Sequence, residues 1–176
     1  MVLSFVLIVF LLIPGLPAKI GALFFFIVAA LTDLWDGRIA RRQKLVSDFG
    51  TLMDPIADKV LVLSAFVAFV QLQVVPAWMV VLIATREFIV TGLRLFALGK
   101  GQILPAEAAG KHKTVSQMVA ISLTLLYLVA REAAMSGGLI RFGPVAIQAL
   151  MLLTVVLTLT SGISFLWKHR KLILSL

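Results

Sequence analysis

The chain is dominated by long apolar stretches, which limit its possible folds more than any other feature of its sequence. Six of them can be delimited, at roughly 3–17, 20–40, 56–72, 76–98, 115–130 and 144–167. The length of each is close to that of a membrane-spanning α-helix, which needs about 20 residues to cross about 30 Å of hydrocarbon. Strands of a membrane barrel would alternate apolar and polar residues, whereas these stretches are apolar on all sides. The pattern predicts an all-α, polytopic membrane protein: six transmembrane helices in a bundle, forming a single domain over residues 1–176.

The composition supports the bilayer as the solvent of this chain. Hydrophobic residues make up 61% of the sequence and charged residues only 14%, and the mean hydropathy is +1.11. Ordinary soluble domains are far more polar. The absence of cysteine excludes disulfides, thiolate metal sites and cysteine nucleophiles. Residues 1–15 have the apolar core of a signal peptide but no basic leader, so we interpret them as the start of the first membrane helix.

The basic residues indicate an orientation in the membrane. The net charge is +8, but in a membrane chain the position of the charges matters more than their sum, so nucleic acid is not the expected partner. Most lie in the second, fourth and last polar segments: Arg38, Arg41, Arg42, Lys44, Lys59, Arg94, Lys100, Lys111, Lys113, Lys168, Arg170 and Lys171. The opposite side has only Lys19, Arg131 and Arg141. The positive-inside rule therefore places both termini and the two large loops on the cytoplasmic side of the cell (inner) membrane, among anionic membrane lipids.

Acidic residues are concentrated in one segment. Five of the eight lie between positions 33 and 58. An aspartate inside a membrane helix costs about 2.5–3.5 kcal/mol, so it persists mainly beside a cavity, a partner charge or a metal ion. Asp33 and Asp36 are three residues apart, and Asp54 and Asp58 are four apart. Each pair therefore shares one face of its helix.

These four aspartates predict a metal site. Carboxylates packed together in a low dielectric repel one another unless cations neutralise them. Carboxylate oxygens suit Mg²⁺ or Mn²⁺, and two such ions are the usual arrangement for phosphoryl chemistry. The alternative is a set of surface salt bridges with nearby basic residues, namely Arg38, Arg41, Arg42 and Lys44. Exposed salt bridges contribute little, so this alternative explains four acids at these spacings less well than a metal site does.

The same segment resembles a family signature. Its pattern is Asp33-x-x-Asp36-Gly37-x-x-Ala40-Arg41, then eight residues, then Gly50-x-x-x-Asp54-x-x-x-Asp58. It matches the signature of the CDP-alcohol phosphotransferases in every fixed position. The resemblance implies a six-helix membrane bundle that forms homodimers.

The resemblance also implies roles for the residues of the signature. Asp33, Asp36 and Asp54 would hold two divalent ions per subunit with help from Asp58, which would also be the general base. The CDP moiety would be bound by Asp33 and by the remaining fixed positions, Gly37, Ala40, Arg41 and Gly50. Small residues make physical sense there, because a nucleotide approaches a helix backbone closely only where side chains are absent.

Downstream basic residues indicate the acceptor alcohol. Residues 84–118 resemble the bacterial phosphatidylglycerophosphate synthases, especially at Arg86-Glu87-Phe88, Val90-Thr91-Gly92-Leu93-Arg94 and Gly110-Lys111-x-Lys113-Thr114. Arg86 lies within an apolar span, so it either pairs with an aspartate or Glu87 or binds an anion. Together with Arg94, Lys111 and Lys113 it is the predicted pocket for the acceptor's phosphate. In the alternative interpretation, Arg86 forms a structural ion pair and the lysines contact lipid headgroups.

The sequence thus predicts transfer of a phosphatidyl group from CDP-diacylglycerol to sn-glycerol 3-phosphate, giving phosphatidylglycerol phosphate and CMP. One alternative is another acceptor in the same family, such as inositol phosphate, serine or another alcohol. A more remote alternative is a divalent-cation transporter, because intramembrane carboxylates also line ion paths. The arginine and small residues of the signature argue against a transporter, since a cation path has no need for an arginine beside it.

Overall fold

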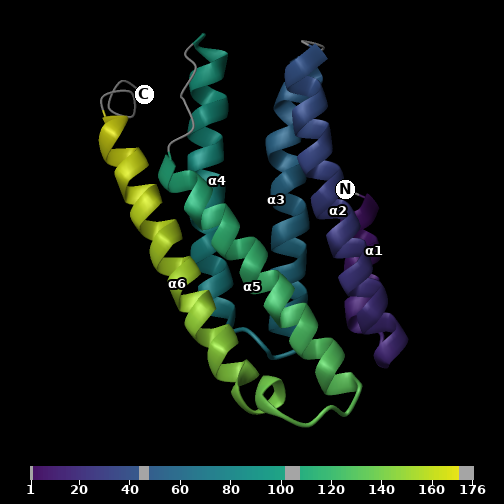
Figure 1. Cartoon of the computed structure of the whole chain (residues 1–176). Helices are drawn as coiled ribbons and strands as arrows, with labels where there is room; N and C mark the ends of the chain where they lie inside the picture. Colours follow the sequence, from purple (N-terminus) through teal and green to yellow (C-terminus); the bar gives the residue numbers. More distant parts are fainter. Residues whose placement is uncertain (1, 44–47, 102–107, 171–176) are drawn as a thin grey trace.

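The structure is a computed structural model that describes residues 2–43, 48–101 and 108–170, with side chains described at 3–32, 59–101 and 112–170. The described residues form α-helices and contain no strand. In chain order they are α1 (Val2–Leu12), α2 (Leu16–Gln43), α3 (Asp48–Gln71), α4 (Ala77–Gly99), α5 (Ala108–Glu132) and α6 (Gly138–Lys168) (Figure 1). The all-α prediction is confirmed for this part of the chain.

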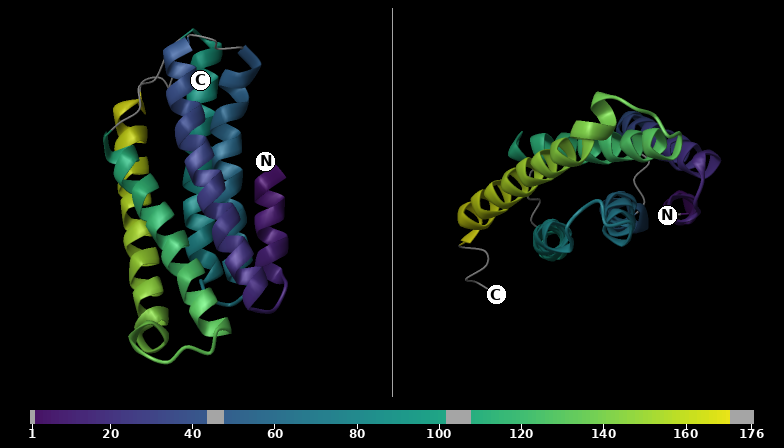
Figure 2. Two further views of the ribbon diagram at one scale, coloured as in Figure 1. Left: turned by 45° about the vertical axis from the view of Figure 1, so that its right-hand side comes forward. Right: turned by 90° about the horizontal axis from the view of Figure 1, so that it is seen from below.

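The helices pack in two layers. Seen end-on in Figure 2, α2, α5 and α6 form one layer, and α1, α3 and α4 form the other. Contacts within the layers join α2 to α5, α5 to α6, α1 to α3 and α3 to α4. Contacts between the layers join α1 to α2, α3 to α5 and α4 to α6. Helices distant in the sequence, such as α2 and α5, therefore lie side by side.

A buried apolar core holds the layers together, and a second apolar surface faces outward. Phe26, Phe66, Phe69, Ile121 and Met151 are almost fully buried. Large apolar side chains are also exposed on every helix, including Phe5, Phe24, Val67, Phe88, Val119 and Ile163. In water such a surface would favour aggregation, whereas lipid tails are an apolar solvent for it.

Within the described residues, two helices are long and apolar enough to cross a membrane. They are the segments His112–Glu132 and Gly138–Lys168. Shorter apolar segments occur at Leu3–Leu12, Leu16–Thr32 and Lys59–Gln71.

The first two helix boundaries differ from the expected ones. The stretch 3–17 was expected to be one helix, but α1 ends at Leu12 and α2 begins at Leu16. Gly15 lies between them with φ +107°, a conformation that glycine adopts without strain. Pro14 cannot continue a helix because it lacks an N–H, whereas Pro17 fits the first turn of α2. With 11 residues, α1 rises only about 16 Å.

The start of α6 also differs from the prediction. An apolar stretch beginning at 144 was expected, but the helix starts at Gly138 and contains Pro144. Proline removes one backbone hydrogen bond from the interior of a helix and bends it. Gly143, which precedes the proline, packs directly against the ring of Tyr127 in α5.

A buried lysine closes the turn between α1 and α2. Lys19 is 2% exposed, and its ammonium donates hydrogen bonds to the carbonyl oxygens of Leu11 at 2.5 Å and Ile13 at 2.9 Å. The last carbonyls of a helix have no partner within it, and a cation there also interacts favourably with the helix dipole. Lys19 therefore caps the C-terminal end of α1.

Lys19→Met should lower the melting temperature in detergent by about 5–10 °C. Hydrogen bonds to a charged group contribute about 1.5–3 kcal/mol, and a chain of this size loses about 2–4 °C per kcal/mol. The control is Lys100→Met, because Lys100 is exposed at the end of α4. Equal melting temperatures for the two variants would contradict the capping role.

Candidate functional site

The acidic signature lies on two consecutive helices. Asp33 and Asp36 are in the second half of α2, and Asp54 and Asp58 are in the first half of α3. The end of α2 and the start of α3 lie at the same end of the bundle, which also holds the end of α4 (Figure 1). We call it the motif end. Because the backbone is helical at all four positions, each aspartate pair has the spacing of a shared helical face.

The side chains of the signature lie outside the described part of the structure. They belong to Asp33, Asp36, Gly37, Ala40, Arg41, Gly50, Asp54 and Asp58. Among the side chains that are described, no group of three or more histidine, aspartate or glutamate residues could hold a metal ion. The metal and CDP assignments therefore remain predictions.

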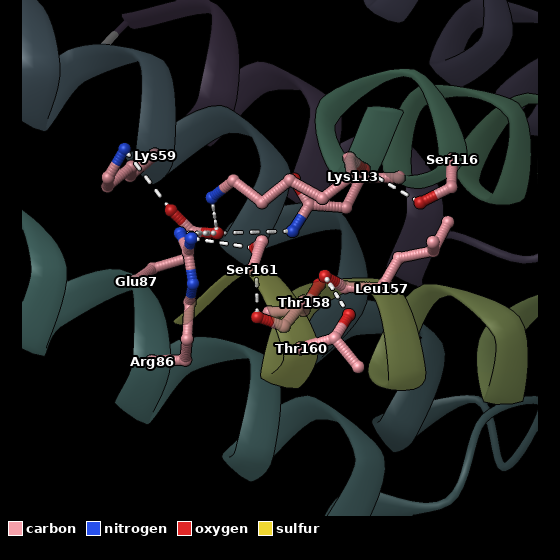
Figure 3. Close-up of polar contacts among 10 residues, drawn as sticks. Lys59, Arg86, Glu87, Lys113, Ser116, Leu157, Thr158, Thr160 and Ser161 are labelled. Atoms are coloured by element: carbon pink, nitrogen blue, oxygen red, sulfur yellow. Dashed lines mark hydrogen bonds and ion pairs between the residues drawn. The ribbon is translucent and has the colours of Figure 1, made fainter. Parts of the chain in front are cut away.

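A buried carboxylate organises the site next to this segment. Glu87 of α4 is 5% exposed, and basic side chains from three helices converge on it (Figure 3). Its Oε2 atom is 3.3 Å from Nζ of Lys59 in α3, and its Oε1 atom is 3.4 Å from Nη1 of Arg86. Lys113 of α5 donates a hydrogen bond to the same Oε1. Gln117 Nε2 lies 3.5 Å from it. We call these five residues the Glu87 cluster.

The Glu87 cluster is strongly basic for a buried site. Three basic side chains surround one carboxylate, and Lys113 is only 7% exposed. Cations in a low-dielectric environment are costly unless anions are close. The cluster also borders a small cavity, whose walls include Lys59, Glu87, Lys113, Thr114 and Gln117. The arrangement is therefore suited to an anion that carries more than one negative charge.

Electrostatics connect this cluster to the acidic signature. Lys59 directly follows Asp58 in the sequence, so the ion pair between Lys59 and Glu87 ties the middle of α3 to α4. A contact of this kind restricts the rotation of α3 about its axis. The rotational position of α3 near Asp58 therefore depends on the Glu87 cluster.

The structure brings some of the predicted acceptor residues together but not all of them. Arg86 and Lys113 meet at Glu87. Arg94 lies two turns further along α4, where its guanidinium is 5.2 Å from the centre of the Phe165 ring. Its Nε is buried and has no hydrogen-bond partner among the described residues. The side chain of Lys111 lies outside the described residues.

Arg86 makes two described contacts that fix its position. Its ion pair with Glu87 at 3.4 Å is the one that the structural alternative expects. The second terminal nitrogen of its guanidinium, Nη2, faces α6 and donates a hydrogen bond to Oγ of Ser161 at 2.8 Å. Arg86 is thus held in place between two helices.

Sequence reasoning missed three contributors to this site. Lys59 was noted only as a basic residue, although its position next to Asp58 could have indicated a role. Gln117 lies one turn after Lys113 on the same face of α5, which is a usable signal. Ser161 of α6 carries no signal in the sequence, because serine is common in membrane helices.

Comparisons with known proteins agree with the signature. Residues 1–160 match the family model described as CDP-alcohol phosphatidyltransferase. A CDP-diacylglycerol–glycerol-3-phosphate 3-phosphatidyltransferase of Bacillus subtilis is 46% identical over 110 residues, 62% of this chain and 57% of the relative. A probable phosphatidylglycerophosphate synthase of Mycobacterium tuberculosis is 42% identical over 139 residues, 79% of this chain and 63% of the relative.

A third relative aligns over nearly its whole length. It is a CDP-diacylglycerol–glycerol-3-phosphate 3-phosphatidyltransferase of Rickettsia felis, 33% identical over 171 residues, 97% of this chain and 90% of the relative. The chain spans only about three fifths of the first two relatives.

Proposed function

This chain belongs to the CDP-alcohol phosphatidyltransferase family, and we propose that it transfers a phosphatidyl group from CDP-diacylglycerol to sn-glycerol 3-phosphate. The products are phosphatidylglycerol phosphate and CMP. One observation carries the choice of acceptor: three basic side chains converge on Glu87, and one of them, Lys59, directly follows Asp58 of the signature. A phosphate monoester bears about 1.5–2 negative charges at neutral pH, which complements this excess of positive charge. The names of the three relatives support the same acceptor.

The reaction requires one proton acceptor. A hydroxyl oxygen of the acceptor attacks the lipid-proximal phosphorus of CDP-diacylglycerol, and the bond between that phosphorus and the oxygen of the CMP group breaks. Asp58 accepts the proton of the attacking hydroxyl, a role that general bases fill with about 10²- to 10⁴-fold rate gains. Asp33, Gly37, Ala40, Arg41 and Gly50 bind the CDP moiety, whose departure as CMP completes the transfer.

The donor set of the signature fits divalent metal ions. Four carboxylates on helical segments, paired at spacings of three and four residues, present hard oxygen ligands from two helices. The family generally uses divalent metals. Asp33, Asp36, Asp54 and Asp58 would hold two ions per subunit, Mg²⁺ or Mn²⁺. When bound, such ions stabilise the negative charge that develops on phosphate oxygens.

Basic residues of α4 and α5 bind the acceptor's phosphate. Arg86, Arg94, Lys111 and Lys113 form the pocket, and Lys59 joins them through its ion pair with Glu87. The buried position of Lys113 excludes much of the water that would otherwise weaken its attraction for phosphate. Glu87 holds Lys113 and Arg86 in place before the acceptor arrives, so little reorganisation is needed on binding.

The protein is a membrane protein, as its spanning helices and its family indicate. We place all six helices in the membrane as one domain over residues 1–176, in a homodimer, with the active site and both termini on the cytoplasmic side. The fold separates two sets of basic residues: Arg94 and Lys113 lie toward the motif end, and Lys19 and Arg131 toward the other. The short α1 would cross with help from tilt or local thinning of the bilayer.

An assay with purified membranes tests the proposed function. Membranes containing the protein, given CDP-diacylglycerol and labelled glycerol 3-phosphate, should form a labelled lipid, and added CMP should reverse the reaction. Inositol phosphate, serine and glycerol should not replace the acceptor. Equal or faster transfer to one of them would assign a different acceptor within the family. No lipid product with any alcohol would overturn the function.

Lys113→Met should raise the KM for glycerol 3-phosphate about ten- to a hundredfold, because a charge-assisted contact to phosphate contributes about 1.5–3 kcal/mol. Arg94→Ala should act in the same direction. The KM for CDP-diacylglycerol should change much less. Lys168→Met, at an exposed lysine near the end of α6, is the control. A change confined to the KM for CDP-diacylglycerol would place these residues at the donor site instead.

A further inference from the structure

Helix α6 supplies a buried wall against the two arginines of α4. Thr158, Ser161, Gly162 and Phe165 are all buried, and their spacing places them on one face of α6. This face contacts α4, since Ser161 accepts a hydrogen bond from Arg86 and Phe165 lies against Arg94. The acceptor pocket predicted from the sequence includes no residue of α6. The structure therefore adds a helix to the site.

Gly162 makes room for the stem of Arg86. A Cβ atom at this position would lie 2.8 Å from Cγ of Arg86, 3.1 Å from its Nε and 3.5 Å from its Cδ. Carbon atoms in contact are normally about 3.5–4.0 Å apart. The stem of an arginine close to its backbone has little freedom to move aside. Any larger residue at 162 would thus displace Arg86 toward another rotamer.

Ser161 fixes the other end of the same side chain. Its Oγ accepts the hydrogen bond from Nη2 of Arg86 at 2.8 Å and donates one to the carbonyl oxygen of Thr158 at 3.1 Å. The second bond holds the serine in one rotamer, so the acceptor oxygen has a defined position. Figure 3 shows Ser161 beside Arg86, which directly precedes Glu87 in α4.

We propose that Ser161 and Gly162 are positioning residues that hold Arg86 in the orientation in which it binds the acceptor's phosphate. The inference rests on the proposed function and extends it to a helix that sequence reasoning left out. Arginine has many rotamers, and its planar guanidinium binds phosphate well only in a narrow range of orientations. A displacement of about 1 Å at a positioned group can cost about a hundredfold in rate.

Gly162→Ala should raise the KM for glycerol 3-phosphate about tenfold and leave the KM for CDP-diacylglycerol nearly unchanged. Gly143→Ala is the matched control. Gly143 is buried in the same helix, near the end of α6 opposite to Gly162. A Cβ atom there would lie 2.5 Å from Cδ2 of Tyr127 and not against Arg86. Both variants introduce one methyl group against a packed side chain. Only Gly162→Ala should change the acceptor's KM, whereas both should lower the melting temperature.

Ser161→Ala should raise the acceptor's KM about three- to tenfold, since one hydrogen bond to a charged group is lost. Combination with Arg86→Ala shows whether the two α6 residues act through the arginine. If they do, Gly162→Ala and Ser161→Ala will have no further effect on acceptor binding in the Arg86→Ala background. Binding is measured in each variant as the rise in melting temperature on adding glycerol 3-phosphate, which needs no turnover.

The results separate this inference from the proposed function. Weaker acceptor binding in Arg86→Ala, with normal binding in both Gly162→Ala and Ser161→Ala, would overturn the positioning role alone. Normal acceptor binding in Arg86→Ala would remove Arg86 from the pocket and overturn the positioning role, whereas the proposed function depends on whether a lipid product forms. Additive losses in the double variants would mean that α6 acts on the acceptor by another route, which also contradicts the inference. Non-additive losses confined to the acceptor would confirm it.

Discussion

Asp36→Asn is expected to reduce kcat by at least about 10³-fold while the protein stays folded. Asparagine keeps the size of the side chain but loses the charge that a divalent ion requires of its ligand. The ions contribute several kcal/mol of charge stabilisation to phosphoryl chemistry, and each 1.4 kcal/mol corresponds to a factor of ten in rate. Removing divalent ions with a chelator should abolish turnover of the unmodified protein, and Mg²⁺ or Mn²⁺ should restore it.

The fifth acidic residue of the same segment provides the control for this experiment. Asp48 begins α3 but lies outside the signature, so Asp48→Asn should keep most of the activity. Both variants should be compared over a range of Mg²⁺ concentrations, together with the increase in melting temperature that Mg²⁺ produces. Near-normal activity of Asp36→Asn in Mg²⁺ would show that the metal assignment is wrong. Equal losses in both variants would point to general repulsion or misfolding instead.

Glu87→Gln is expected to destabilise the protein by about 3–5 kcal/mol, the typical cost of removing one partner of a buried ion pair. Glutamine preserves the shape of the side chain, but Lys59, Arg86 and Lys113 lose the carboxylate that they share. For a chain of this size the melting temperature in detergent should fall by about 10 °C or more. Acceptor or inorganic phosphate should raise it more in the variant than in the unmodified protein, because phosphate replaces the missing charge.

A double substitution separates charge balance from function. Glu87→Gln combined with Lys113→Met removes one charge of each sign, so most of the lost stability should return. Acceptor affinity should fall below that of the unmodified protein, because the lysine that contacts the phosphate is absent. Recovered stability together with unchanged acceptor affinity would make the pair purely structural. A melting temperature for Glu87→Gln that matches the unmodified protein would contradict the central place of Glu87.

Local patterns in the sequence were sufficient for the helices and for the acidic signature. Apolar stretches predict membrane helices because the requirement of the bilayer applies to every residue of the span. Aspartates three and four residues apart share a face in any α-helix, whatever surrounds it. The exact ends of α1 and α6 were less predictable, although Pro14 and Gly15 were visible. A break at this proline competed with an apolar stretch that continued to Pro17.

The relative positions of the basic residues were not contained in any local pattern. Arg86 could be expected to need a partner, and Glu87 was among those considered. That Lys59 and Lys113 share the same carboxylate depends on how α3, α4 and α5 are rotated against one another, and this rotation is set by packing of the whole core.

Sequence alone thus determined what can be decided within one helix: the apolar spans, the spacing of Asp33, Asp36, Asp54 and Asp58, and the resemblance that these residues carry. Tertiary structure alone decided that Ser161 and Gly162 meet Arg86, 75 residues away from Ser161 along the chain. A serine or glycine in an apolar helix has no preferred partner of its own. Its role depends on which side chain the neighbouring helix presents, and only the packed bundle specifies that.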